Sequence, residues 1–187
     1  VIMLLNLAHD AGDLRGWPSW AIGLALVTAL ATPLVAMRWY TPQRLAAEAT
    51  RRLARQGVAV AGGPDVASVA ALYRDRAGNL NELADAIHPF FVPPTPTAEM
   101  CAQHFTEAAL GGLGALHARL ATCTWQASEL GQAVKQTAAE SGLKMAQLAI
   151  PLRVALLGLP QSPSIDAVLD VLGRERVLAR LAKVLAA

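Results

Sequence analysis

The feature that most constrains the fold is an uncharged run near the start of the chain, GWPSWAIGLALVTALATPLVAM, which fills residues 16–37. A helix from Ser19 to Met37 would extend roughly 28 Å at about 1.5 Å per residue, close to the hydrocarbon core of a bilayer at about 30 Å. Aromatic side chains flank both ends, as at the two interfaces of a membrane: Trp17, Trp20, Trp39 and Tyr40. The run therefore predicts a transmembrane helix over 16–40.

A buried core helix of a water-soluble domain is the alternative interpretation of this run. Arg15 alone precedes it, whereas several arginines follow: Arg38, Arg44, Arg51, Arg52 and Arg55. This charge bias predicts a single-pass protein in the membrane, with its C-terminal domain on the cytoplasmic or mitochondrial matrix side. Residues 1–15 form an N-terminal apolar segment, either an interfacial helix or part of a larger element. The acidic residues before the run argue against a cleavable signal peptide.

The rest of the chain has the composition of a helical protein. Hydrophobic residues make up 54% of the chain but aromatic residues only 5%, and the abundant alanine and leucine favour helices. Three prolines in VPPTPT, at 92–97, exclude a helix there and predict a semi-rigid connector. We therefore expect an all-α fold, with a first helical subdomain at 41–92 and a second at 93–187.

Capping residues and breakers predict the ends of individual helices. Thr41 and Asp65 are candidate caps, an apolar helical pattern runs from Asn79 to Phe91, and Thr97 starts a further helix. Within the second subdomain, three further signals indicate starts and interruptions. The glycines at 111, 112 and 114 predict that the helix that Thr97 starts is weakened in its middle or ends there. Ser128 is a candidate cap, and Pro151 predicts a kink or break near Ile150.

Few residues are arranged for chemistry. The chain lacks the phosphate-binding glycine loops and any Cys/His set with metal-ligand spacing, and its two cysteines, Cys101 and Cys123, suit reduced thiols. Four scattered histidines form no catalytic group. We therefore expect no metal, no cofactor and no small-molecule substrate, and predict that this chain is not itself an enzyme. The net charge of +2 is compatible with an RNA partner without requiring one.

Several motifs together resemble the C-terminal anticodon-binding region of bacterial-type glutamyl-tRNA synthetases, without the catalytic domain. They are YRDRA followed by NLNELA and FF in 73–91, Trp125, GLKM in 142–145, PLRVAL in 151–156 with Gly158, then Ser162-Pro163, LGRE in 172–175 and Arg180-Leu181. The resemblance covers roughly Trp39 to Ala187. It implies an α-helical domain that grips the anticodon loop of the tRNA for glutamate.

The resemblance also implies a set of nucleic-acid-binding residues. By position, Arg153 would contact a base edge or a phosphate, and Ser162, Pro163 and Ile165 would line a pocket for an unstacked base. A guanidinium offers a planar fork of donors to such groups, and single-stranded loops are recognised by bases held in pockets. Leu157 stands where the family usually has threonine before the glycine.

A purely structural role for the same residues is the alternative. Arg153 would then cap helix carbonyls or pair with Asp166 or Asp170, and the segment from Ser162 to Ser164 would be a loop and a helix cap.

The uncharged run and the missing catalytic motifs together favour a membrane-anchored, non-catalytic protein. In this interpretation the synthetase-like domain is an accessory or structural subunit of a membrane protein complex, with the membrane and other subunits as partners. The alternative is the region of a synthetase that recognises the anticodon of the tRNA for glutamate, or a tethered tRNA-binding module. A third interpretation is a soluble synthetase fragment whose first 40 residues are a diverged core.

Overall fold

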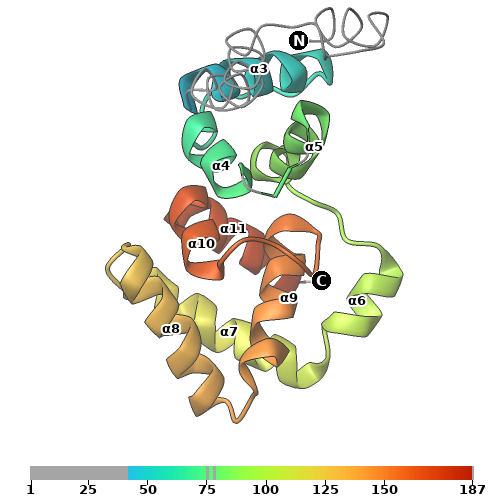
Figure 1. Cartoon of the computed structure of the whole chain (residues 1–187). Helices are drawn as coiled ribbons and strands as arrows, with labels where there is room; N and C mark the ends of the chain where they lie inside the picture. Colours follow the sequence, from blue (N-terminus) through green and yellow to red (C-terminus); the bar gives the residue numbers. More distant parts are fainter. Residues whose placement is uncertain (1–41, 75, 78, 187) are drawn as a thin grey trace, which may run out of the picture. The chain divides into compact units, whose positions relative to one another are not determined.

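The computed structural model describes residues 42–186, except 75 and 78, and this part of the chain is helical without strands. Figure 1 shows the helices in chain order. They are α3 (Pro42–Arg55), α4 (Val66–Tyr73), α5 (Leu80–Phe91), α6 (Ala98–His104), α7 (Glu107–Thr122), α8 (Ala127–Glu140), α9 (Met145–Leu157), α10 (Ile165–Leu172) and α11 (Arg174–Leu185). The predicted all-α fold is confirmed for these residues.

The predicted transmembrane helix at 16–40 and the apolar segment at 1–15 lie outside the described residues. Within the described part of the chain, every helix is too short or too polar to cross a bilayer. Residues 45–187 form one compact unit, and the division into subdomains at the proline-rich connector stays a prediction.

Side-chain caps begin several helices where the sequence predicts them. Asp65 accepts a hydrogen bond from the N–H of Ser68 at the start of α4. Asn79 accepts from two backbone N–H groups at the start of α5, and Thr97 accepts from the N–H of Met100 in α6. Each cap satisfies donors that the first turn of a helix leaves unpaired.

The predicted end of a helix at the three glycines is wrong, because the helix that Thr97 starts ends before them. Helix α6 ends at His104, Thr106 caps α7 by accepting from the N–H of Ala109, and all three glycines lie inside α7. Packing explains one of them: a Cβ on Gly112 would approach the Cδ1 of Leu143 to 2.7 Å. Tertiary contact here outweighs the low helix propensity of glycine, about 1 kcal/mol per residue relative to alanine.

Two other local predictions also need correction. Helix α8 begins at Ala127, after Gln126, so Ser128 lies within its first turn and is not its cap. The predicted break near Ile150 is wrong, because helix α9 continues through Pro151, although that residue has no N–H to donate to the preceding turn. The other predicted outcome, a kink at this point, stays a prediction. Pro151 is buried.

The core includes the apolar faces of α7 to α11, together with buried side chains of α3, α4 and α5. Helix α7 packs against α8, α9 and α11, and α8 also contacts α10, as Figure 1 shows. Leucines that are fully removed from solvent fill the space between them: Leu113, Leu116, Leu120, Leu130, Leu148, Leu152, Leu156 and Leu169. Each such side chain contributes about 1.5–3 kcal/mol through burial. This packing fixes α9 and α10, and with them the loop that joins these helices.

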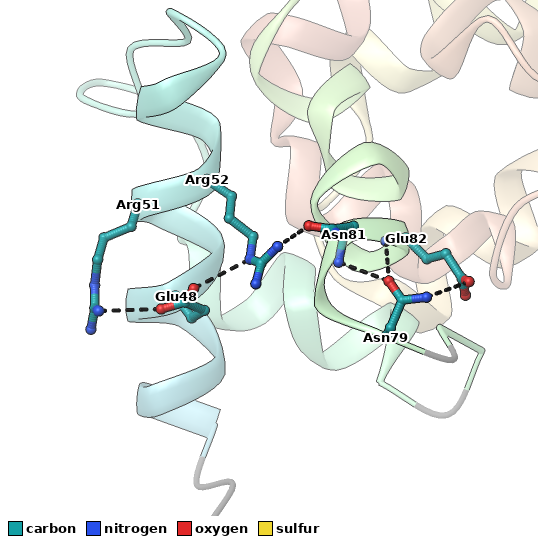
Figure 2. A network of polar contacts seen from close by, with 6 residues as sticks. All are labelled: Glu48, Arg51, Arg52, Asn79, Asn81 and Glu82. Atoms are coloured by element: carbon teal, nitrogen blue, oxygen red, sulfur yellow. Dashed lines mark hydrogen bonds and ion pairs between the residues drawn. The ribbon is translucent and has the colours of Figure 1, made fainter.

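A polar network links α3 to the start of α5 (Figure 2). Glu48 forms ion pairs with Arg51, at 3.2 Å, and with the Nε of Arg52, at 3.3 Å. Arg52 also donates a hydrogen bond to the side-chain oxygen of Asn81. Exposed ion pairs on one helix stabilise it only slightly, so the main effect of Glu48 is to orient Arg52 toward α5.

The α5 end of the network is the cap formed by Asn79. Its side-chain oxygen accepts from the N–H groups of Asn81 and Glu82, both at 3.0 Å, and its amide nitrogen donates to the Glu82 carboxylate at 2.6 Å. Figure 2 shows these bonds meeting at Asn79. The network therefore fixes the first turn of α5 just after the segment that carries Arg76.

Candidate nucleic-acid interface

The candidate interface is built around the loop between α9 and α10. Gly158 ends α9 in the left-handed conformation, with φ of 71°, and its N–H donates to the carbonyl of Val154. Glycine adopts this conformation without the strain that a Cβ introduces. The loop then carries Leu159, the most exposed large apolar residue of the described part, with 46% of its surface accessible.

Two of the predicted site residues meet in this loop. The Nε–H of Arg153, on α9, donates to the hydroxyl of Ser162 at 3.0 Å. That hydroxyl donates in turn to the carbonyl of Pro163 at 2.9 Å. Ser162 therefore aligns the guanidinium while using only one of its five donors, and both terminal NH2 groups of Arg153 have no partner among the described residues.

A second arginine approaches the same loop from a distant part of the sequence. The guanidinium of Arg76, just after α4, donates to the carbonyl of Ser162 at 3.3 Å. The side chain of Arg76 is exposed. Sequence reasoning assigned no role to this residue, although its motif was part of the family resemblance. Charge within a motif of that kind was the one signal that could have identified it.

The position of Arg76 depends on Tyr73. The N–H of Arg76 donates to the Tyr73 carbonyl at 2.9 Å, in the turn that ends α4. The Tyr73 ring is buried and packs edge-on against Phe90 of α5, with ring centroids 6.0 Å apart. Burial raises the pKa of the Tyr73 phenol to about 12, against a smaller opposing effect of the Arg76 charge. The phenol therefore stays neutral at physiological pH beside the cationic group.

The other predicted site residues are less accessible. Pro163 is buried, and Ile165 is 6% exposed and belongs to the hydrophobic core. Their role in a base pocket stays a prediction. The alternative in which Arg153 pairs with Asp166 or Asp170 is not observed, since Arg153 donates to Ser162 instead. Ser164 begins α10 without a capping hydrogen bond from its side chain.

The arrangement suits recognition of planar, electron-rich groups. Two guanidinium groups reach one loop residue, one through its hydroxyl and one through its carbonyl. Each keeps donors for acceptors such as base edges or phosphate oxygens. Within the described part of the chain, no three of its His, Cys, Asp and Glu residues are grouped to hold a metal ion.

Comparison with known proteins decides the family. A sequence model described as "Anticodon binding domain" matches residues 34–185. The chain belongs to this family. The predicted resemblance is thereby confirmed over nearly the range that the motifs indicated.

Two curated relatives of this anticodon-binding domain are both named as glutamate–tRNA ligases. The chain is 58% identical over 139 residues to a glutamate–tRNA ligase of Azoarcus sp. and 55% identical over 140 residues to that of Aromatoleum aromaticum. These matches cover 74% and 75% of this chain but 30% of each relative. The chain thus spans about a third of the length of the curated relatives it matches.

Solved structures show the same fold as this anticodon-binding domain. The crystal structure of a glutamate tRNA ligase from Elizabethkingia meningosepticum, in complex with its amino acid, aligns with a TM-score of 0.70 at 18% identity. The match covers 81% of this chain and 30% of that chain. The glutamate-tRNA synthetase of Elizabethkingia anophelis aligns with a TM-score of 0.66 at 20% identity, covering 80% and 29%.

These comparisons correct the predicted function and localisation. The interpretation as a membrane-anchored accessory subunit of a membrane complex is wrong, and so is the predicted membrane localisation. The family match begins at residue 34, inside the predicted span of 16–40, and the relatives are named as glutamate–tRNA ligases. The absence of charge at 16–37 does not by itself identify a membrane span, because hydropathy alone does not distinguish a membrane span from other apolar segments.

Proposed function

We propose that this chain is the anticodon-recognition region of a glutamyl-tRNA synthetase and binds the anticodon loop of the tRNA for glutamate. The observation that carries the proposal is the convergence of Arg153 and Arg76 on Ser162. The identity of 58% to a glutamate–tRNA ligase supports the choice of tRNA.

The proposed recognition uses two arginines, Arg153 and Arg76. Ser162 holds the Nε–H of Arg153, which leaves the two terminal NH2 groups as a fork of donors for a ligand. Such a fork binds two acceptors on one base edge and discriminates among bases by about 1–3 kcal/mol. Arg76 is exposed and, among the described residues, donates to the Ser162 carbonyl, so it supplies a second cationic donor group at the same loop.

Binding of two tRNAs across a salt series tests this proposal. We expect the tRNA for glutamate to bind more tightly than an unrelated tRNA, with a preference that persists as salt rises, since base contacts depend on salt less than phosphate contacts do. Arg153→Ala should weaken binding of the tRNA for glutamate by about tenfold or more and leave the unrelated tRNA nearly unaffected.

A matched control is Arg119→Ala. Arg119 lies on α7 and pairs with Glu140 of α8 at 2.5 Å, so its loss should lower both affinities little and equally. Equal, weak binding of both tRNAs to the unaltered protein would refute the proposal.

A further inference from the structure

A second feature of the fold is a cavity of about 400 Å³ between the proline-rich connector and the helices that follow it. Pro94 and Pro96 of the connector form one wall, and α6, α7, α9 and α11 supply the others. Its size lies within the range of about 300–1,000 Å³ that small-molecule sites occupy. None of the residues of the candidate nucleic-acid interface lines it.

The walls of this cavity are mostly apolar. They include Phe105, Leu110, Ala155 and Val184, together with the half-buried thiol of Cys101. An elongated apolar group is therefore the kind of ligand body that would fill the space, because its transfer from water to such walls is favourable in proportion to the area buried.

Two cations lie at the cavity, and they differ in how far their charge is compensated. Arg180 is only 7% exposed, and its guanidinium donates to the carbonyls of Pro89, Phe90 and Leu156. These carbonyls belong to the last turns of α5 and α9, where the helix dipoles place partial negative charge. The charge of Arg180 is thus largely offset within the fold.

Lys183 is the second cation at the cavity, and its charge is not compensated in this way. It follows Arg180 by one turn of α11, lines the same cavity and is exposed. It forms no ion pair within the described residues, and no aspartate or glutamate lines the cavity. An anionic group at this end of the cavity would meet an unpaired ammonium beside an apolar space.

We propose that this cavity binds a small amphipathic carboxylate, with its aliphatic or aromatic body against Phe105 and Leu110 and its carboxylate at Lys183. The site is separate from the proposed tRNA interface and does not depend on it. Charge complementarity selects an anion over a cation of the same length, and the apolar walls select a medium-length chain over a short polar acid.

Octanoate is the probe for a direct test on the full chain. We expect saturable one-to-one binding by calorimetry, whereas octylammonium at the same concentrations should not bind. The two cysteines provide a second readout, since Cys101 lines the cavity and Cys123 does not. Octanoate at ten times its Kd should slow the alkylation of Cys101 by iodoacetamide about tenfold and leave Cys123 unchanged.

Two variants separate the cavity from nonspecific binding. Lys183→Glu should weaken octanoate binding about three- to tenfold, whereas Lys135→Glu, an exposed control on α8, should not. Leu110→Trp should fill the space and abolish binding. Octanol or octylammonium binding as tightly as octanoate, equal protection of both cysteines, or no saturation would each overturn the proposal.

Discussion

Pro94 of the connector lies against Gly158, at the end of α9, so closely that no side chain fits between them. A Cβ built on Gly158 would lie 2.8 Å from the Cβ of Pro94. The contact joins two segments far apart in the sequence and covers the residue where the candidate tRNA-binding loop begins. The proline ring is short and stiff, so it cannot move aside as the end of a long side chain can.

Gly158→Ala should therefore destabilise the protein by about 2–4 kcal/mol. The left-handed conformation at φ of 71° costs roughly 1 kcal/mol for alanine, and the overlap with Pro94 adds the remainder. Urea denaturation followed by circular dichroism measures the change in the free energy of unfolding.

Substitutions at two other glycines separate the cost of the backbone conformation from the cost of the overlap with Pro94. Gly142 also has a positive φ, of 66°, but no atom lies within 4 Å of its built Cβ, so Gly142→Ala should cost only about 1 kcal/mol. Gly111 is exposed inside α7 with open space around it, and Gly111→Ala should stabilise by up to about 1 kcal/mol. Equal losses at Gly158 and Gly142 would mean that Pro94 moves aside.

Arg180→Met should destabilise the protein by about 3 kcal/mol or more. The variant keeps an apolar stem but leaves the carbonyls of Pro89, Phe90 and Leu156 without their donor, and each buried unpaired group costs about 1–3 kcal/mol. Chemical denaturation measures this loss. Lys183→Met, one turn later on the exposed side of α11, is the control and should change stability by less than about 0.5 kcal/mol.

The contribution of Tyr73 to stability should fall as the pH rises from about 10 to 12. The unfolded phenol ionises near pH 10, whereas burial holds the folded pKa at about 12. In this window the unfolded chain carries fewer protons, so unfolding is favoured, and the loss is complete once the folded phenol ionises. Tyr73→Phe should lose less stability across this range in denaturation experiments.

The comparison with the variant is necessary because Arg180 acts in the opposite direction. Burial, followed by the charge of Arg176, lowers the pKa of Arg180 to about 10, so its contribution to stability increases as the pH rises above that value. Arg180 is present in both proteins and its effect cancels in the difference. Identical pH profiles for the two proteins would show that Tyr73 titrates normally in the folded state.

Asn79→Ala should destabilise the protein by about 1 kcal/mol, within a range of about 0.5–2 kcal/mol, because α5 loses the cap that accepts from two N–H groups. Thermal denaturation detects this as a lower Tm. The matched control is Ser164→Ala, since Ser164 begins α10 without a side-chain capping bond. A loss at Ser164 as large as that at Asn79 would contradict the assignment of the cap.

Local signals predicted much of the fold because they act over a few residues. Asp65, Asn79 and Thr97 each begin a helix as expected, since a cap bonds only to its own first turn. The glycines of α7 do not end a helix, and one of them, Gly112, packs closely against Leu143, more than two dozen positions away. A local sequence pattern does not predict a contact between residues so far apart.

The candidate site shows the same division. Arg153 and Ser162 could be proposed from the family motifs, and the structure places them in contact. Arg76 received no role, because its acceptor is a main-chain carbonyl of a residue 86 positions away. Every residue has a main-chain carbonyl, so the sequence does not indicate which carbonyl an arginine will bind. The folded structure is needed to identify it.

Three arginines of the described residues join the helices before the connector to those after it, and they share a property with consequences for sequence change. Arg76 donates to the carbonyl of Ser162, Arg176 to that of Gly62, and Arg180 to that of Pro89. Every amino acid carries a main-chain carbonyl, so a substitution at an acceptor position leaves the acceptor atom in place. Each contact therefore depends on the identity of the arginine alone. Three salt bridges in the same places would depend on the identity of six side chains.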